Sequence, residues 1–193
     1  MNIDEGPLEF PSAMPAPGTD VTGISGSLIQ QVIDASRQSP RRRIIMPFHK
    51  SSDDSLQRML NAIQPGSYIR PHRHVNPPKS ESIVVLKGII CFVEFSESGD
   101  IGSVMVAGSA LPLLGIDIDA TVYHTYFALE PDTVLFEVKP GPYDEGSDKQ
   151  FAPWAPAEGS VGCREFAANI EESAKQSWSQ ELIVKPRDRA FLP

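Results

Sequence analysis

Short apolar stretches recur along the middle of the chain and are separated by turn-forming residues. Residues 83–86 and 89–95 are rich in Ile, Val and Phe and flank a break at Gly88, a pattern typical of two strands joined by a tight turn. The series of predicted strands continues through residues 101–107, 110–118, 122–129 and 133–139. Strands of this length and spacing predict a mainly β fold, a sandwich or a small barrel.

Two segments have helical spacing instead. Residues 27–38 and 164–178 place apolar side chains at intervals of three and four, which predicts one amphipathic helix at each end of the barrel. Pro40 ends the first helix. Residues 56–63 fit both a helix and a strand, and the periodicity does not decide between them.

A chain of 193 residues is long enough for one well-buried domain with extensions. We expect an amino-terminal arm and helix over residues 1–40, a barrel over 41–145, and a loop and helix packed on the barrel over 146–193. The first 27 residues hold four prolines among small and acidic residues, which is typical of a loose arm.

The charge and the termini narrow the functional classes. A net charge of −8 disfavours a nucleic-acid partner, so Arg41, Arg42 and Arg43 are interpreted as a solvated edge. We find no apolar run of the roughly 18–20 residues that a membrane span needs and no signal-peptide pattern. We therefore expect a cytoplasmic protein, with Cys91 and Cys163 reduced and Cys91 in the core.

Two closely spaced histidines are the first candidate metal ligands in the sequence. His72 and His74 are two residues apart, and in a strand that spacing places both imidazoles on one face, about 7 Å apart along the backbone. By the same parity, Tyr68 and Arg70 would line the interior if Pro71 inserts no bulge. Glu81 opens an apolar strand, where a carboxylate needs a partner or a cation. His124 lies in another strong strand, and such nitrogen and oxygen donors suit Fe(II), Mn, Ni, Zn or Cu better than Ca or Mg.

The larger pattern resembles the first motif of the cupin superfamily, which is Gly, five residues, His-x-His, three or four residues, Glu, six residues, Gly. Here the motif residues are Gly66, His72, His74, Glu81 and Gly88, with a longer interval before the glutamate. In the second cupin motif, Pro-x-Gly, two residues, His, three residues, Asn, the histidine is kept. Asp119-Ala120-Thr121 stands for Pro-x-Gly, His124 for the histidine and Ala128 for the asparagine.

Further segments resemble one cupin subgroup, the WbuC-type metalloproteins, over about residues 40–160. They include residues 70–74, 76–81, 85–88, 137–143 and 151–158. The resemblance implies a cupin double-stranded β-helix, or jelly-roll barrel, with short terminal helices. It also implies one divalent transition metal ion, Fe, Mn, Zn or Ni, bound by His72, His74, Glu81 and His124. WbuC-type proteins are associated with bacterial O-antigen gene clusters, so surface-polysaccharide metabolism is the expected setting.

Other polar residues complete the predicted site. We expect Arg58, Arg70, Arg73 and Lys79 to surround the barrel mouth and bind an anionic substrate, although ion pairing within the protein explains them equally well. Strand parity turns Tyr126 rather than Tyr123 inward. The candidate acid–base residues are Tyr126, Glu137 and His49, although a position behind the site or on the surface is favoured for His49.

Three functions remain open. The first is a metalloenzyme that isomerises or epimerises a small anionic or sugar-type molecule by Lewis-acid chemistry. The second is an Fe(II)-dependent dioxygenase, and the third is a non-catalytic sugar- or metabolite-binding cupin. A homodimer that pairs through sheet edges is expected, with no nucleic acid and no membrane as partner.

Overall fold

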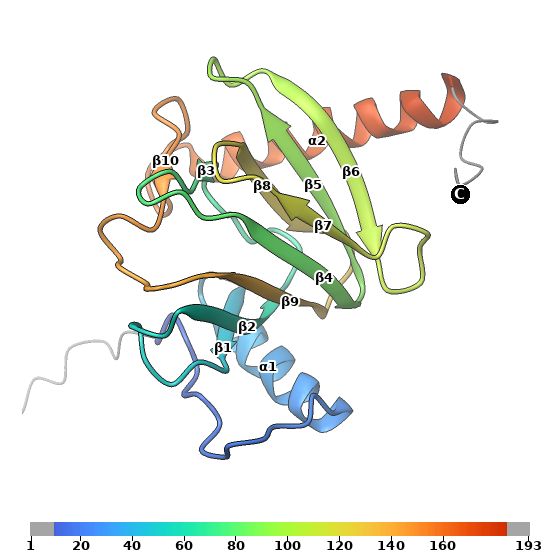
Figure 1. Ribbon diagram of the computed structural model, residues 1–193. Helices are drawn as coiled ribbons and strands as arrows, with labels where there is room; N and C mark the ends of the chain where they lie inside the picture. Colours follow the sequence, from blue (N-terminus) through green and yellow to red (C-terminus); the bar gives the residue numbers. More distant parts are fainter. Residues whose placement is uncertain (1–9, 185–193) are drawn as a thin grey trace, which may run out of the picture.

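The computed structural model describes residues 10–184, which form two five-stranded antiparallel sheets and two helices (Figure 1). The first sheet has the order β1 (Arg43–Pro47), β2 (Leu56–Ile63), β9 (Thr133–Pro140), β4 (Glu81–Lys87) and β7 (Gly115–Ile118). The second has the order β10 (Gln150–Phe151), β3 (His72–Arg73), β8 (Tyr123–Ala128), β5 (Ile89–Phe95) and β6 (Ile101–Gly108). The helices are α1 (Gly26–Gln38) and α2 (Cys163–Val184).

The strand order identifies the fold. Strands far apart in sequence are neighbours: β9 lies between β2 and β4, and β8 lies between β3 and β5. A chain that alternates in this way between two facing antiparallel sheets forms a jelly roll. The double-stranded β-helix that the cupin resemblance implies is therefore confirmed.

Alternation along each strand divides its side chains between two environments. In β4, Ile83 and Val85 are buried between the sheets, whereas Val84 faces outward and is exposed. The inward residues of seven strands and their loops make one apolar core between the sheets, as expected for facing sheets. The same alternation places the polar residues of the site at one end of this interior.

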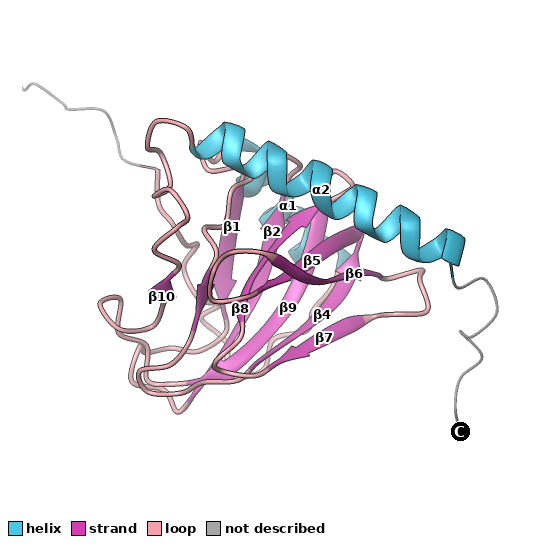
Figure 2. Ribbon diagram, turned by 90° about the horizontal axis from the view of Figure 1, so that it is seen from above, coloured by secondary structure: helices cyan, strands magenta, loops and turns pink. Residues whose placement is uncertain are grey.

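The two helices cover the outer faces of the two sheets (Figure 2). Ser25 caps α1 by accepting a hydrogen bond from the backbone of Leu28, and Val32 and Ile33 bury the apolar stripe of this helix against β1 and β2. In α2, Phe166, Ile170 and Ala174 pack over the second sheet. Both predicted helices are confirmed, and Cys91 lies in the core under α2.

Residues 56–63 form a strand, and their burial explains the ambiguous periodicity. Asn61 and Ile63 face the barrel interior, while Leu60 and Ala62 pack under α1. Because both faces are covered, the segment shows no clean polar alternation. The predicted strand over 110–118 is wrong for its first half, because Leu111 lies in a turn closed by its bond to Gly108 and the strand begins only at Gly115.

Two other expectations need correction. The described part of the amino-terminal arm is docked on the barrel: the Met14 amide donates to the Ile45 carbonyl (2.8 Å), and the Met14 side chain packs in the cluster under α1. The arginine run is not simply a solvated edge. Arg41 and Arg43 both bind the carboxylate of Glu158, at 3.0 and 2.6 Å, because the loop before α2 folds back over β1.

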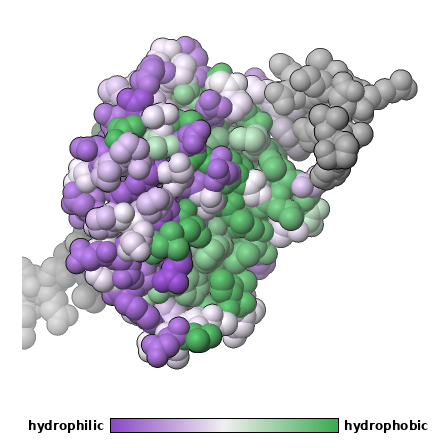
Figure 3. Space-filling view, in the orientation of Figure 1, coloured by the Kyte–Doolittle hydropathy of each residue, from purple (hydrophilic) through white to green (hydrophobic). Residues whose placement is uncertain are grey.

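Some apolar side chains remain on the surface. Figure 3 shows them gathered on the side of the molecule where β4 and the turn before β7 lie, and Val84, Leu113 and Leu114 are among the exposed ones. The homodimer expected from the sequence stays a prediction. Among the described residues, no helix is long and apolar enough to cross a membrane.

Candidate metal centre

The four predicted ligands meet inside the barrel although they come from both sheets. His72 lies in β3 directly opposite His124 in β8, His74 follows β3, and Glu81 is the first residue of β4. All four side chains are buried, with at most 3% of each residue exposed. The three histidines each have a ring nitrogen within 4.8 Å of the others', a separation that one metal ion can bridge.

Main-chain carbonyls fix the orientation of each imidazole. The Nδ1 atoms of His72 and His124 lie 2.9 and 3.0 Å from the carbonyls of Arg70 and Val122, and Nδ1 of His74 contacts the carbonyl of Asp148. Because a carbonyl only accepts hydrogen bonds, each Nδ1 carries the proton. Each Nε2 is then left with a free lone pair, the arrangement found in metal-binding histidines.

The Nε2 atoms of His74 and His124 face the Glu81 carboxylate without forming a hydrogen bond to it. Nε2 of His74 lies 3.4 Å from Glu81 Oε2, and Nε2 of His124 lies 3.5 Å from Glu81 Oε1. Both Nε2 atoms are buried and have no hydrogen-bond partner among the described residues. Lone pairs that face each other across this distance repel unless a cation lies between them. The donor set therefore fits a metal ion.

The protonation states agree with this fit. Burial lowers the pKa of His72 well below its usual 6.5, and the nearby Lys149 lowers it further, so the imidazole is neutral at pH 7. Burial by itself raises the pKa of Glu81, but positive charge on the His124 and His74 side of the carboxylate, together with Lys139, outweighs burial and holds that pKa well below 4.5. A bound cation would supply that charge where the two Nε2 atoms carry no proton. Neutral imidazoles and an ionised carboxylate are the forms that bind metal.

Local folding accommodates two of the three departures from the cupin motifs. The amide of Val122 donates to Asp119 (3.2 Å), and that of His74 donates to the Ala120 carbonyl (2.9 Å), so the altered turn is tied to the first motif. The longer interval before Glu81 folds back on itself, with the amide of Lys79 donating to the carbonyl of His74 (3.0 Å). The extra residues therefore do not displace Glu81.

A second polar group lies in the same interior. Tyr126 points inward, as parity predicts, and its hydroxyl lies 3.3 Å from Glu137 Oε2. Asn61, which sequence reasoning missed, donates from Nδ2 to the Tyr126 hydroxyl (3.2 Å) and to Glu137 (3.3 Å). Burial and the charge of Glu81 raise the pKa of Glu137 above its usual 4.5, and burial raises the pKa of Tyr126 well above 10.

The third acid–base candidate lies elsewhere. His49 is outside the group of three histidines, and its Nδ1 lies against the backbone of Arg58, 3.2 Å from the amide nitrogen and 3.1 Å from the carbonyl oxygen. The structure therefore does not bring His49 to the centre, in line with the surface alternative.

The predicted cationic rim is wrong in its placement. Arg58 points away from the interior, into a cavity of about 420 Å³ on the outer face of the first sheet. Arg73 also points outward, over the Tyr123 ring, and binds Gln150 and Glu97. Lys79 is buried and binds the Pro142 carbonyl (2.5 Å) and Asp148 (3.2 Å).

Strand alternation is interrupted at Pro71, which explains why Tyr68 and Arg70 do not line the interior as predicted. Ile69 and His72 both face the interior, which regular alternation forbids. Tyr68 consequently faces outward, packing edge-on against Phe166 and donating to the Pro156 carbonyl (2.8 Å). Arg70 donates to the Ala152 carbonyl (3.1 Å) and lies over the Phe151 ring.

Sequence reasoning also missed a buried charge cluster beside the centre. Asp148 accepts hydrogen bonds from Lys139 (2.6 Å) and Lys79 (3.2 Å), and its carbonyl orients His74. Lys139 is two residues from Glu137 on β9, so parity alone could have placed it in the interior. Asp148 lies in a loop without periodicity, and no signal in the sequence could have found it.

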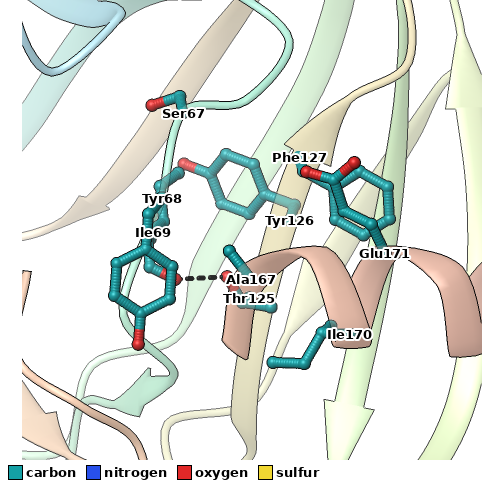
Figure 4. Close-up of a pocket in the computed structure, with 9 residues that line it drawn as sticks. All are labelled: Ser67, Tyr68, Ile69, Thr125, Tyr126, Phe127, Ala167, Ile170 and Glu171. Carbon is teal, nitrogen blue, oxygen red and sulfur yellow. Dashed lines mark hydrogen bonds between the residues drawn. The ribbon is translucent and has the colours of Figure 1, made fainter. Parts of the chain in front are cut away.

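A smaller cavity lies on the other side of β8. It measures about 10 Å³, the space of one water molecule, and is lined by β8 residues together with Ala167 and Ile170 of α2 (Figure 4). Thr125 donates to the Ile69 carbonyl there (2.6 Å). Neither this cavity nor the larger one is lined by any of the four predicted ligands.

Fold and centre together define a class, a double-stranded β-helix with three histidines and one glutamate inside. Residues 24–106 match a family described as a domain of unknown function, DUF6016. This span includes His72, His74 and Glu81 and ends before His124. No curated protein matches the chain.

Solved structures with similar folds are distant in sequence. The capsular polysaccharide assembling protein CapF from Staphylococcus aureus is 21% identical over 55% of this chain and 28% of its own, with a TM-score of 0.42. L-ribose isomerase from Cellulomonas parahominis is 15% identical over 63% of this chain and 72% of its own, with a TM-score of 0.46. The chain thus spans less than a third of CapF, and the fold assignment above rests on the strand order.

Proposed function

We propose that the chain is a WbuC-type cupin metalloenzyme that isomerises or epimerises a small hydroxylated, sugar-type molecule, in keeping with surface-polysaccharide metabolism. One observation carries the proposal: buried Nε2 lone pairs of two histidines face the Glu81 carboxylate at 3.4 and 3.5 Å, without a hydrogen bond. His72, His74, His124 and Glu81 would hold the ion. When bound, a divalent transition metal supplies Lewis-acid polarisation of a carbonyl or hydroxyl group.

Glu137 is the residue suited to move the proton. Both isomerisation and epimerisation remove a proton from a carbon beside a carbonyl and return one, to a neighbouring carbon or to the other face. The raised pKa of Glu137 makes its carboxylate a stronger base than an exposed glutamate, so that it accepts a proton more readily. Ser82 pairs with Val138 across β4 and β9, so Glu137 lies diagonally from Glu81, at a typical spacing of about 7–8 Å.

Tyr126 and Asn61 position this base. Their hydrogen bonds hold Glu137 Oε2 from two sides, and the high pKa of Tyr126 keeps its hydroxyl protonated as a donor. Asn61 Oδ1 is buried and has no hydrogen-bond partner among the described residues, so it is free to accept from a substrate hydroxyl.

The test is elemental analysis of untagged protein beside two sets of variants. We expect about one equivalent of a transition metal in the wild type, its loss in the His72→Ala/His124→Ala double variant, and its retention in His49→Ala, the matched histidine control. With metal bound, Glu137→Gln should abolish the exchange of substrate carbon-bound hydrogen with deuterated water, measured by NMR over a panel of aldoses and ketoses.

The outcomes separate the alternatives. Absence of metal from the wild type after reconstitution with Fe, Mn, Zn and Ni would leave a non-catalytic binding protein. Bound iron with oxygen consumption and no proton exchange would contradict the isomerase proposal in favour of a dioxygenase.

A further inference from the structure

Among residues 10–184, one lysine beside the barrel interior, Lys149, forms no ion pair with an acidic side chain. Three lysines lie near the buried carboxylates: Lys79, Lys139 and Lys149. The first two donate to the same carboxylate, that of Asp148. Lys149 makes no hydrogen bond and no ion pair with any described residue, although it directly follows Asp148.

Strand register places Lys149 on the inner face. In the β10–β3 pair, Phe151 is opposite His72, and Gln150 is opposite Arg73. Opposite residues share a face, and the Gln150 side chain accepts a bond from the outward-facing Arg73 (2.6 Å). Lys149, two residues before Phe151, therefore falls on the His72 side.

The electrostatics of the interior agree with this placement. Burial lowers the pKa of Lys149, the Lys139 charge lowers it further, and Glu137 and Glu81 oppose the shift. Lys149 in turn lowers the pKa of His72. These are the groups that surround the metal centre and the proposed base, and the residue as a whole is only half-buried. Lys149 thus lies between the buried interior and the surface.

We propose that Lys149 binds the carboxylate of the substrate, which makes the substrate a small hydroxycarboxylate of the sugar-acid type. This inference rests on the proposed function and adds the charge of its substrate. An unpaired ammonium is satisfied by an anionic group. The free Asn61 Oδ1 accepts from a hydroxyl on the same molecule. Lys149, in the loop before β10, thus supplies the positive charge for substrate binding that the predicted rim of Arg58, Arg70, Arg73 and Lys79 does not supply.

The test measures binding separately from activity. Calorimetric titration of the metal-loaded protein compares three hydroxycarboxylates, glycolate, tartronate and glucuronate, with uncharged ethylene glycol and glucose. We expect at least one hydroxycarboxylate to bind more tightly than its neutral counterpart. Lys149→Met should weaken that binding by about tenfold or more, and Lys149→Arg should restore part of it. Lys87→Met, a matched change at an exposed lysine, should have no effect.

Metal content and thermal unfolding of every variant are measured in parallel. Normal metal content with hydroxycarboxylate affinity unchanged in Lys149→Met overturns the inference and leaves the proposed function intact. So does a wild type that binds none of the three acids at millimolar concentration. Binding of inorganic phosphate alone, lost in Lys149→Met, overturns the carboxylate assignment. Absence of metal from the wild type defeats the proposed function itself, a result seen before any ligand is added.

Discussion

Glu81 and Glu137 lie on neighbouring strands of one sheet, and the interior acts on them in opposite directions. Positive charge beside Glu81 outweighs burial and holds its pKa well below 4.5, while burial and the Glu81 charge raise the pKa of Glu137. When the environment pushes the pKa values of two carboxyl groups apart, one group stays ionised and the other can act as an acid or base. In the proposed reaction, Glu81 stays an anion and Glu137 exchanges protons.

Glu137→Gln should increase stability at neutral pH. A carboxyl group whose pKa is raised in the folded state binds more protons folded than unfolded, so stability falls as pH rises above 4.5, its usual value. The variant removes this loss. Urea unfolding in EDTA from pH 4 to 8 should show an advantage for Glu137→Gln that grows from about pH 4.5 and levels off above the folded pKa. The exposed control Glu130→Gln should show none, and a pH-independent difference would contradict the explanation.

The elements differ in how completely their sequence reveals them. The apolar stripe of helix α1 is visible in the sequence because only one face of the helix is buried. Strands β4 and β5 are visible as two runs rich in β-branched residues on either side of Gly88. In contrast, β2 is covered on both faces by parts of the chain distant in sequence, which no local pattern reveals. The irregularity at Pro71 reverses parity, so the placement of Tyr68 and Arg70 could not follow from counting residues.

Gly88 illustrates a motif residue with a physical role in its element. Its φ is +77°, and a Cβ there would lie 2.3 Å from the Thr133 hydroxyl. Gly88→Ala should therefore cost about 1–3 kcal/mol of unfolding free energy for the backbone alone, with the clash in addition. Gly146→Ala, where the nearest atom would be 3.7 Å away, is the control. Equal urea midpoints for the two variants would count against the clash.

The whole molecule has four layers, α1, the first sheet, the second sheet and α2, and the candidate centre spans the two inner ones. The cupin resemblance implied the four ligands, because His72, His74, Glu81 and His124 stand at matching positions of its motifs. Asn61, Asp148 and Lys149 could not be predicted in the same way, since contacts across the barrel bring them in. The ligands come from β4 in one sheet and from β3 and β8 in the other, so an ion there would join the sheets.

Metal should therefore stabilise the whole fold. A ligand that binds only the folded state at 100 times its Kd adds about 2.7 kcal/mol, which corresponds to about 5 °C or more in Tm for a chain of this size. Differential scanning calorimetry with added Mn or Zn and with EDTA should show this shift in the wild type and in His49→Ala. The shift should vanish in His72→Ala/His124→Ala. Equal shifts in all three proteins would mean that the metal binds elsewhere.

The carbonyl of Asp148 also has a consequence for assembly. The strands of both sheets pair through contacts that do not involve the loop between β9 and β10, yet the ring of His74 is oriented only once that loop has closed over it. We therefore expect a chain in which this loop is open to bind metal more weakly than the closed chain, because His74 would no longer be held in one orientation.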